Sequence, residues 1–74
     1  MISYRPLFNT MRRKNVTSYT LTVKMEFSRS KYQNIKSGNG CSFATLDELC
    51  QLLDCEVSDI IEYVPDDEVD NQKN

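Results

Sequence analysis

Apolar side chains recur at helical spacing in the segment after Ser42, and this repeat constrains the fold more than any other feature of the sequence. The repeat consists of Phe43, Leu46, Leu49, Cys50 and Leu53, with Asp47, Glu48 and Gln51 on the opposite side. Such spacing predicts an amphipathic helix with one buried stripe, and Ser42 has a suitable side chain to cap it. We therefore expect this helix to form the centre of the core.

Two short helices are predicted nearer the N-terminus. Pro6 suits the first turn of one helix, in which Leu7 and Met11 lie one turn apart. Thr17 can cap a second helix. The buried stripe of this second helix would consist of Ser18, Leu21, Thr22 and Met25. The segment Y-T-L-T-V also alternates as a strand does, so a strand is the alternative there.

Two further helices are expected around the core helix. Ser28 can cap a short helix with Tyr32 and Ile35 turned inward, and Gly38 can end it in the left-handed conformation. A last helix is predicted at about residues 58–63. Its apolar residues available for burial are Val57, Ile60, Ile61 and Val64. The predicted fold class is therefore all-α, with five short helices.

The length and composition of the chain allow one domain. Its 74 residues and 39% hydrophobic content are enough for a modest single core. The tail D-D-E-V-D-N-Q-K-N holds one apolar residue and cannot bury enough surface to offset its ordering entropy. We expect a folded domain at residues 1–65 and an acidic disordered tail at residues 66–74.

Several functional classes are disfavoured. The longest apolar runs are pairs such as Leu52-Leu53, and no secretory pattern opens the sequence, so we expect a cytoplasmic protein without membrane contact. Histidine is absent and the three cysteines form no C-x-x-C pair, which leaves a zinc site without its full ligand set. We expect no metal, no cofactor and no enzymatic activity, because no acid–base pair lies at a fixed spacing.

The charged residues are divided between two halves of the chain. Residues 1–40 carry eight basic side chains and one acid, a net charge of +7, whereas residues 41–74 carry ten acids and one base, a net charge of −9. The basic half favours a polyanionic partner, although a solvated surface is the simpler alternative. The acidic half offers a face for a protein partner.

Taken together, these elements resemble the Cro/CI-type helix-turn-helix family of transcriptional regulators, particularly its short single-domain members. The resemblance covers nearly the whole chain. It is carried by M-I-S-Y-R-P-L, N-V-T-S-Y-T-L, the loop after Ile35 with Gly38, and L-D-E-L-C-Q-L-L-D-C-E-V-S-D-I-I-E-Y-V-P. It implies a lambda-repressor-like DNA-binding domain, with a helix-turn-helix made by the second and third helices and the third helix in the major groove.

This resemblance and the helical spacing assign candidate contacts with double-stranded DNA. The outward residues of the third helix, expected to contact bases, are Ser28, Arg29, Ser30, Gln33 and Asn34. Arginine can bind guanine through two hydrogen bonds, and glutamine or asparagine can do the same with adenine. The residues expected to contact the DNA backbone are Thr17, Ser18, Arg12, Arg13, Lys31, Lys36 and Asn39.

Three positions depart from the family pattern. Thr22 stands where a smaller residue, often alanine, is usual, and Tyr32 stands where isoleucine or valine is usual. Glu26 replaces the turn glycine, so we expect either a strained residue at positive φ or a different turn. Buried Tyr32 needs a partner for its hydroxyl group.

The sequence thus predicts a sequence-specific DNA-binding regulator, a repressor, that reads DNA with residues 28–36. A homodimer is expected, paired through the last helix with Tyr63 and Val64 beside Ile60. The alternative is a protein-interaction module on the same fold, such as an antitoxin or accessory regulator, with weak or no specific DNA binding. RNA binding is a third interpretation, in which Tyr4, Phe8 and Tyr19 stack on bases.

Overall fold

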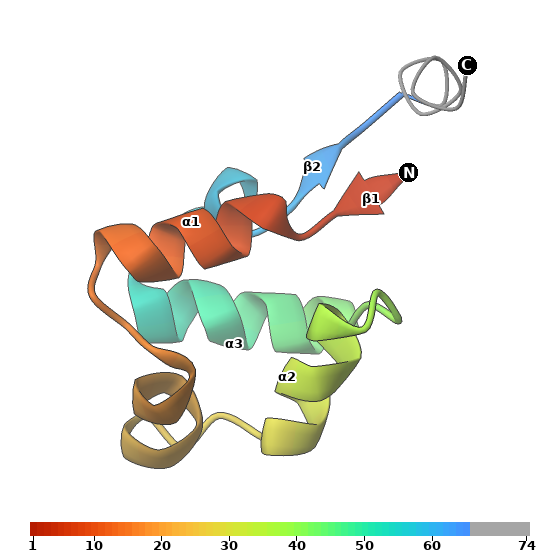
Figure 1. Ribbon diagram of the computed structural model, residues 1–74. Coiled ribbons are helices and arrows are strands. Elements are labelled where there is room, and N and C mark those ends of the chain that lie inside the picture. The colour runs from red at the N-terminus through yellow and green to blue at the C-terminus, as the bar shows by residue number, and fades with distance from the viewer. Residues whose placement is uncertain (66–74) are drawn as a thin grey trace.

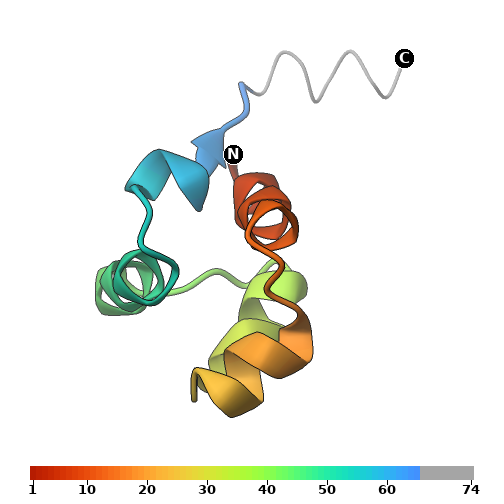
Figure 2. The same cartoon turned by 90° about the vertical axis from the view of Figure 1, so that its left-hand side faces the viewer.

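The first and last strands of the described chain pair in a small sheet, at the opposite end of the molecule from its second helix (Figures 1 and 2). The computed structural model describes residues 1–65, and the predicted tail at residues 66–74 lies outside them. The described part holds four helices, one additional 3₁₀ turn and two strands. Their order is β1 (Ile2–Ser3), α1 (Arg5–Arg13), η1 (Thr20–Lys24), α2 (Arg29–Lys36), α3 (Phe43–Leu53), η2 (Val57–Asp59) and β2 (Glu62–Tyr63).

The first helix forms as its sequence predicts. Pro6 lies in the first turn of α1. Amides in this turn have no partner within the helix, so the missing N–H of proline costs no hydrogen bond there. Arg12 and Arg13 occupy the last turn, where positive charge interacts favourably with the helix dipole. Leu7 and Met11 are buried. The spacing of these two apolar residues therefore identified the face of α1 that packs on the core.

The second helix is confirmed, and the strand alternative is wrong. Two helical residues, Ser18 and Tyr19, lead into η1, whose backbone has the wider π-type hydrogen bonding. The Thr17 hydroxyl accepts a hydrogen bond from the Thr20 amide at 3.0 Å, as a capping side chain does. The predicted stripe is narrower than expected, because Leu21 alone among its four residues is fully buried.

Serine side chains cap both α2 and α3. The Ser28 hydroxyl accepts a hydrogen bond from the Lys31 amide at 3.3 Å, and the Ser42 hydroxyl accepts one from the Thr45 amide at 3.1 Å. Beyond the end of α2, Gly38 has a φ of +84°, a conformation that costs glycine little. Both caps and this turn residue are as predicted.

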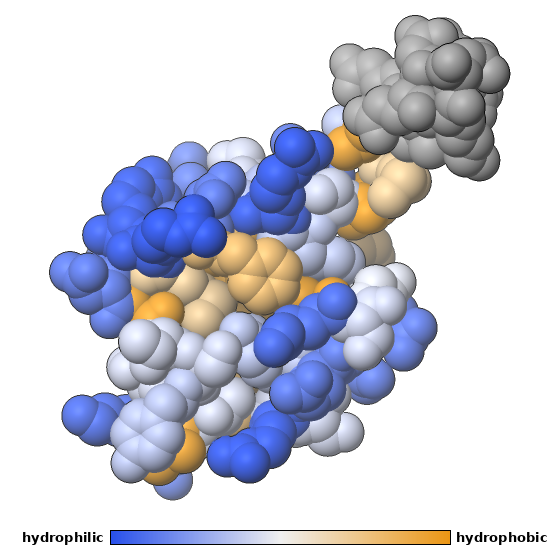
Figure 3. All heavy atoms as spheres, in the orientation of Figure 1, coloured by the Kyte–Doolittle hydropathy of each residue, from blue (hydrophilic) through white to orange (hydrophobic). Residues whose placement is uncertain are grey.

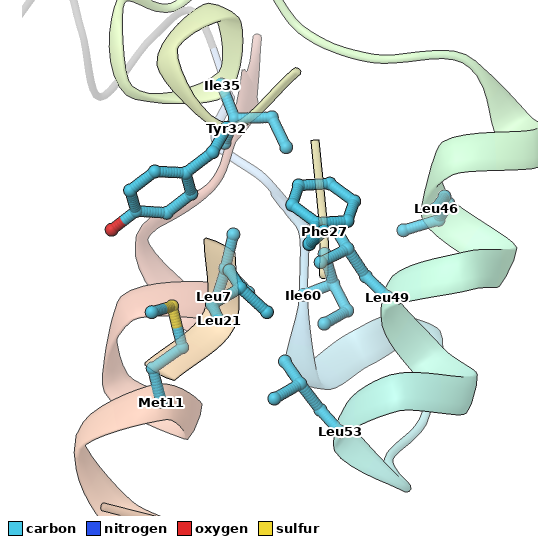
Figure 4. Packing of buried hydrophobic residues seen from close by; sticks show 10 residues of the cluster. All are labelled: Leu7, Met11, Leu21, Phe27, Tyr32, Ile35, Leu46, Leu49, Leu53 and Ile60. Atoms are coloured by element: carbon cyan, nitrogen blue, oxygen red, sulfur yellow. The ribbon is translucent and has the colours of Figure 1, made fainter. Parts of the chain in front are cut away.

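The core lies where the four helices, the turn before α2 and the segment after η2 meet (Figure 4). Its buried hydrophobic residues are Leu7, Met11, Leu21, Phe27, Tyr32, Ile35, Leu46, Leu49, Leu53 and Ile60. The prediction that Phe43 belongs to this core is wrong, because its exposed fraction is 88%. Phe43 is the first residue of α3, and helical spacing places it to one side of the face that Thr45, Leu46, Leu49 and Leu53 bury. Cys50 is half-buried.

The predicted fifth helix at residues 58–63 is also wrong. The chain makes only the single 3₁₀ turn η2 and then extends into β2. β2 pairs antiparallel with β1, with Ile2 opposite Tyr63 and Ser3 opposite Glu62. The β-branched residues of this segment favour extended backbone, and strand pairing supplies hydrogen bonds that a short exposed helix would lack. The fold is therefore mostly helical with a two-stranded sheet, not all-α with five helices.

Candidate nucleic-acid interface

The turn between η1 and α2 is built around a glutamate and a buried phenylalanine. Glu26 has a φ of +60°, in the left-handed region that favours glycine. Phe27 follows with a 1% exposed fraction, and its amide donates a hydrogen bond to the Leu21 carbonyl at 3.0 Å. Burial of Phe27 holds the turn in place. The sequence predicted either a strained Glu26 at positive φ or a different turn, and the structure has Glu26 at positive φ.

Tyr32 connects α2 to the start of the second helix. Its hydroxyl shares a hydrogen bond with the Ser18 hydroxyl at 2.6 Å, while 4% of the residue is exposed. The ring packs edge-on against Phe8 at a centroid distance of 6.4 Å. Lys36 places its Nζ 5.6 Å from the same ring centroid, within reach of a cation–π interaction. The expected partner for the tyrosine hydroxyl is thus present, and it fixes α2 against the second helix.

Four polar side chains on the outward face of α2 are free to bind a partner. Arg29, Ser30, Gln33 and Asn34 are exposed. Within residues 1–65, none of them has a side-chain hydrogen bond or ion pair. Figure 3 shows polar residues covering the region where Figure 1 draws α2. Ser28 differs from these four, because it is half-buried and its hydroxyl caps the helix.

A shallow hollow of about 260 Å³ lies between the second helix and α2. Arg29 and Lys36 both line it, and no acidic residue does. These two cations are seven positions apart along α2, which corresponds to roughly 10 Å at 1.5 Å rise per residue. A hollow with two cations and no carboxylate is suited to a polyanion such as the DNA backbone.

Four of the residues expected to contact the DNA backbone lie around this helix pair. Ser18 and Lys36 line the hollow, although both also contact Tyr32. Thr17 is exposed, and its hydroxyl serves as the cap of the second helix. Asn39 is exposed in the loop after α2.

The other three expected backbone contacts have protein partners. Arg13 Nη2 lies 3.7 Å from Asp59 of η2, which draws this side chain toward the segment after α3. Lys31 Nζ lies 3.7 Å from Glu48 of α3. Arg12 Nη1 donates a hydrogen bond to an asparagine of its own helix at 3.1 Å. The structure therefore does not gather all the predicted basic side chains at one surface.

Two residues of the hollow were not among the predicted DNA contacts. Tyr19 and Thr22 both line it, and Tyr19 has an exposed fraction of 61%. Helical spacing contained a signal for Thr22, which lies four residues after Ser18 on the second helix, but not for Tyr19, which follows Ser18 directly. The prediction placed Thr22 in the buried stripe, whereas it is only half-buried.

A larger hollow of about 450 Å³ between α1 and η2 does not have the features of a reactive site. Its Arg5 and Arg13 lie 3.1 Å and 3.7 Å from carboxylates of Glu62 and Asp59, so its charges are paired. Among residues 1–65 there is no cluster of three or more histidine, cysteine or acidic side chains placed to hold a metal ion. Within the same residues, no helix is long and apolar enough to cross a membrane.

Two helices joined by a tight turn, with a polar outward face and a basic hollow between them, define a helix-turn-helix DNA-binding domain. The chain belongs to the Cro/C1-type helix-turn-helix DNA-binding domain family, which it matches over residues 7–66. No curated protein matches it. Among solved structures it is similar to a crystal structure of the transcriptional regulator VanUg. That similarity has 25% sequence identity and a TM-score of 0.75, and covers 86% of this chain and 85% of that chain.

The family match and the structural similarity confirm the family expected from the sequence. They support a DNA-binding regulator of transcription, and the family is a DNA-binding one rather than a family of enzymes. The second helix and α2, which form the two helices of the motif, both lie inside the matched residues.

Proposed function

We propose that this protein is a sequence-specific transcriptional repressor that binds double-stranded DNA by placing α2 in the major groove. The observation that carries this proposal is the outward face of α2, beside a basic hollow. There the side chains of Arg29, Ser30, Gln33 and Asn34 have no hydrogen-bond or ion-pair partner among residues 1–65. Polar side chains left unpaired on a rigid helix are available to hydrogen-bond base edges. Bound to its operator, a domain of this kind represses by occupying the site.

Each of these side chains has a distinct role in the proposed complex. Arg29 is the first residue of α2, the end that meets bases in helix-turn-helix proteins, and its guanidinium would bind guanine O6 and N7. Gln33 or Asn34, one turn further along, would bind adenine N6 and N7. Ser30 would bind either a base or a phosphate. Each bidentate pair would supply about 1–3 kcal/mol of discrimination between bases.

The DNA backbone would be held on both sides of α2. Thr17 and Ser18 stand at the start of the second helix, where the first backbone amides could donate to a phosphate. Lys36 and Asn39 stand at the other end of α2. These contacts would set the position of α2 in the groove without selecting a sequence.

We further propose that the protein binds as a homodimer to inverted half-sites about one helical turn apart. The pairing surface expected from the sequence needs revision, because Ile60 is fully buried. Apolar residues are instead exposed on the sheet, where Ile2 and its cross-strand partner Tyr63 have exposed fractions of 53% and 66%. We place the contact between two copies at this sheet, which lies away from the second helix in Figures 1 and 2.

Selection from a random duplex library tests the proposed sequence recognition. The purified protein should enrich a palindromic motif, and Arg29→Ala and Asn34→Ala should each relax the preference at one position of every half-site. Lys14→Ala is a matched control, because Lys14 is an exposed cation beyond the end of α1. This control should leave the motif unchanged.

The alternative function is a protein-interaction module on the same fold. The observation that favours it is the pairing of Lys31 with Glu48 and of Arg13 with Asp59. Because these two cations already have acidic partners, they are less available to bind DNA phosphates. If the library yields no motif, and if all variants bind duplexes with equal weak affinity that salt abolishes, this alternative replaces specific DNA recognition.

A further inference from the structure

The end of α3 brings two cysteines together through its backbone geometry. Leu53 is the last residue of the helix, and Asp54 follows in the left-handed conformation with a φ of +49°. The Asp54 amide donates to the Gln51 carbonyl at 3.4 Å, and the Cys55 amide donates to the Cys50 carbonyl at 3.0 Å. This pair of hydrogen bonds is the Schellman motif, which folds the chain back over the last turn of a helix.

A Schellman motif places the side chains at the positions of Cys50 and Cys55 in contact, and these positions are commonly apolar. Here both are thiols, which lie close enough for each to affect the pKa of the other. Both cysteines are free and half-buried, so a small reagent has access to them. The backbone thus aligns two thiols that the DNA-binding face does not use.

The third cysteine cannot take part in this pair. Cys41 precedes α3, and its amide donates a hydrogen bond to the Tyr4 hydroxyl at 3.1 Å. The length of α3 separates Cys41 from Cys55, roughly 16 Å at 1.5 Å rise per residue. A disulfide requires Cα atoms within about 7 Å of each other. The cap of α3 brings only Cys50 and Cys55 together.

We propose that Cys50 and Cys55 are an oxidation site, at which a low-molecular-weight disulfide converts the two thiols into an intramolecular disulfide across the C-terminal cap of α3. The thiolate of one cysteine attacks a sulfur of the small disulfide, which breaks the S–S bond and releases one small thiol. The second cysteine then attacks the resulting mixed disulfide and releases the other small thiol. Two electrons pass to the small disulfide, and the two cysteine protons end on the two released thiols.

The bridge would tie the last turn of α3 to the segment that leads into η2. Both parts carry core residues, since Leu53 lies within the bridged segment, Ile60 follows it, and both are buried. The cross-link restricts the unfolded chain and leaves the outward face of α2 untouched. We therefore expect oxidation to raise the melting temperature by several degrees without changing affinity for DNA.

Oxidised glutathione is the probe for this proposal. The full chain is incubated with it at mildly alkaline pH, quenched with acid, alkylated and analysed by intact mass and peptide mapping. The expected product has lost two hydrogens, carries no glutathione on Cys50 or Cys55, and keeps Cys41 alkylatable. Cys41→Ser should form the same bridge. Cys50→Ser should stop at a mixed disulfide on Cys55.

The same reaction in concentrated urea measures what the fold contributes. The ratio of bridge to mixed disulfide should be several-fold higher in the native protein, because the cap holds the two sulfurs together before reaction. Stable mixed disulfides at Cys50 and Cys55 in the native protein would overturn the proposal. Bridges between chains through Cys41, or a bridged protein with a lower melting temperature, would overturn it as well.

Discussion

The hydroxyl groups of Tyr32 and Ser18 lie 2.6 Å apart, and this hydrogen bond joins the helix proposed to read DNA to the helix proposed to hold its backbone. Tyr32→Phe removes the bond and keeps the ring contacts with Phe8 and Lys36. We expect a loss of about 1 kcal/mol in the free energy of unfolding, measured by urea titration. Affinity for the selected duplex should fall as well, because α2 loses part of its support.

Tyr19→Phe is the matched control for this prediction. Tyr19 is an exposed tyrosine on the second helix, and its hydroxyl has no hydrogen bond within residues 1–65. Its substitution should leave the free energy of unfolding within about 0.5 kcal/mol of the wild type. Equal losses in the two variants would show that the Tyr32–Ser18 bond does not stabilise the fold.

Glu26→Gly should stabilise the protein. Glu26 has a φ of +60°, which costs a residue with a side chain roughly 1–2 kcal/mol and costs glycine much less. The greater freedom of glycine in the unfolded chain offsets part of this gain, so we expect a net increase of about 1 kcal/mol or less. Thermal unfolding measures it. Glu26→Gln keeps the backbone penalty and removes the charge, so a gain in this variant instead would assign the effect to electrostatics.

Glu48→Gln should strengthen nonspecific binding to DNA. Glu48 pairs with Lys31 at 3.7 Å, and the side chains of Lys31 and Glu48 are 51% and 41% exposed, so the pair contributes little to stability. Without it, Lys31 is free to contact a phosphate, and the slope of log affinity against log salt should steepen by about one unit. The comparison is Asp47→Asn, which removes one charge from the same helix. Identical slopes in both variants would mean that net charge, rather than Lys31, is responsible.

Alkaline pH should destabilise the fold through three groups. Burial raises the pKa values of Tyr4, Cys50 and Cys55, and the negative charge of Asp47 raises that of Cys50 further. Each pKa is higher in the folded chain than in the unfolded one. The stabilisation is therefore complete below the ordinary values of 9.0 for a thiol and 10.0 for tyrosine, and is lost as pH rises through the raised values. Urea titrations from neutral to alkaline pH should show this fall, and Cys50→Ala with Cys55→Ala should reduce it.

Local features of the fold were predictable from the sequence because neighbouring residues determine them. Ser28 and Ser42 cap helices through bonds to amides three residues away, and Gly38 ends α2 by its own backbone freedom. The pairing of β1 with β2 joins residues about sixty positions apart, for which the sequence carries no local signal. Phe43 continues the helical pattern of α3 but lies to one side of the face that the other elements bury.

For the candidate site too, the sequence predicted the local features and missed the tertiary contacts. Helical spacing placed Tyr32 inward and Arg29, Gln33 and Asn34 outward, as the structure has them. The ion pair of Lys31 with Glu48 is a tertiary contact, so no pattern in the sequence predicted it.

The most direct test of the account is the affinity of wild type, Arg29→Ala and Lys14→Ala for the selected duplex and for a scrambled duplex of equal composition, at one salt concentration. Sequence reading by α2 predicts that Arg29→Ala loses about 5- to 150-fold in affinity for the selected duplex and little for the scrambled one. Lys14→Ala should keep the wild-type ratio between the two duplexes. If wild type binds both duplexes equally, α2 does not read a sequence.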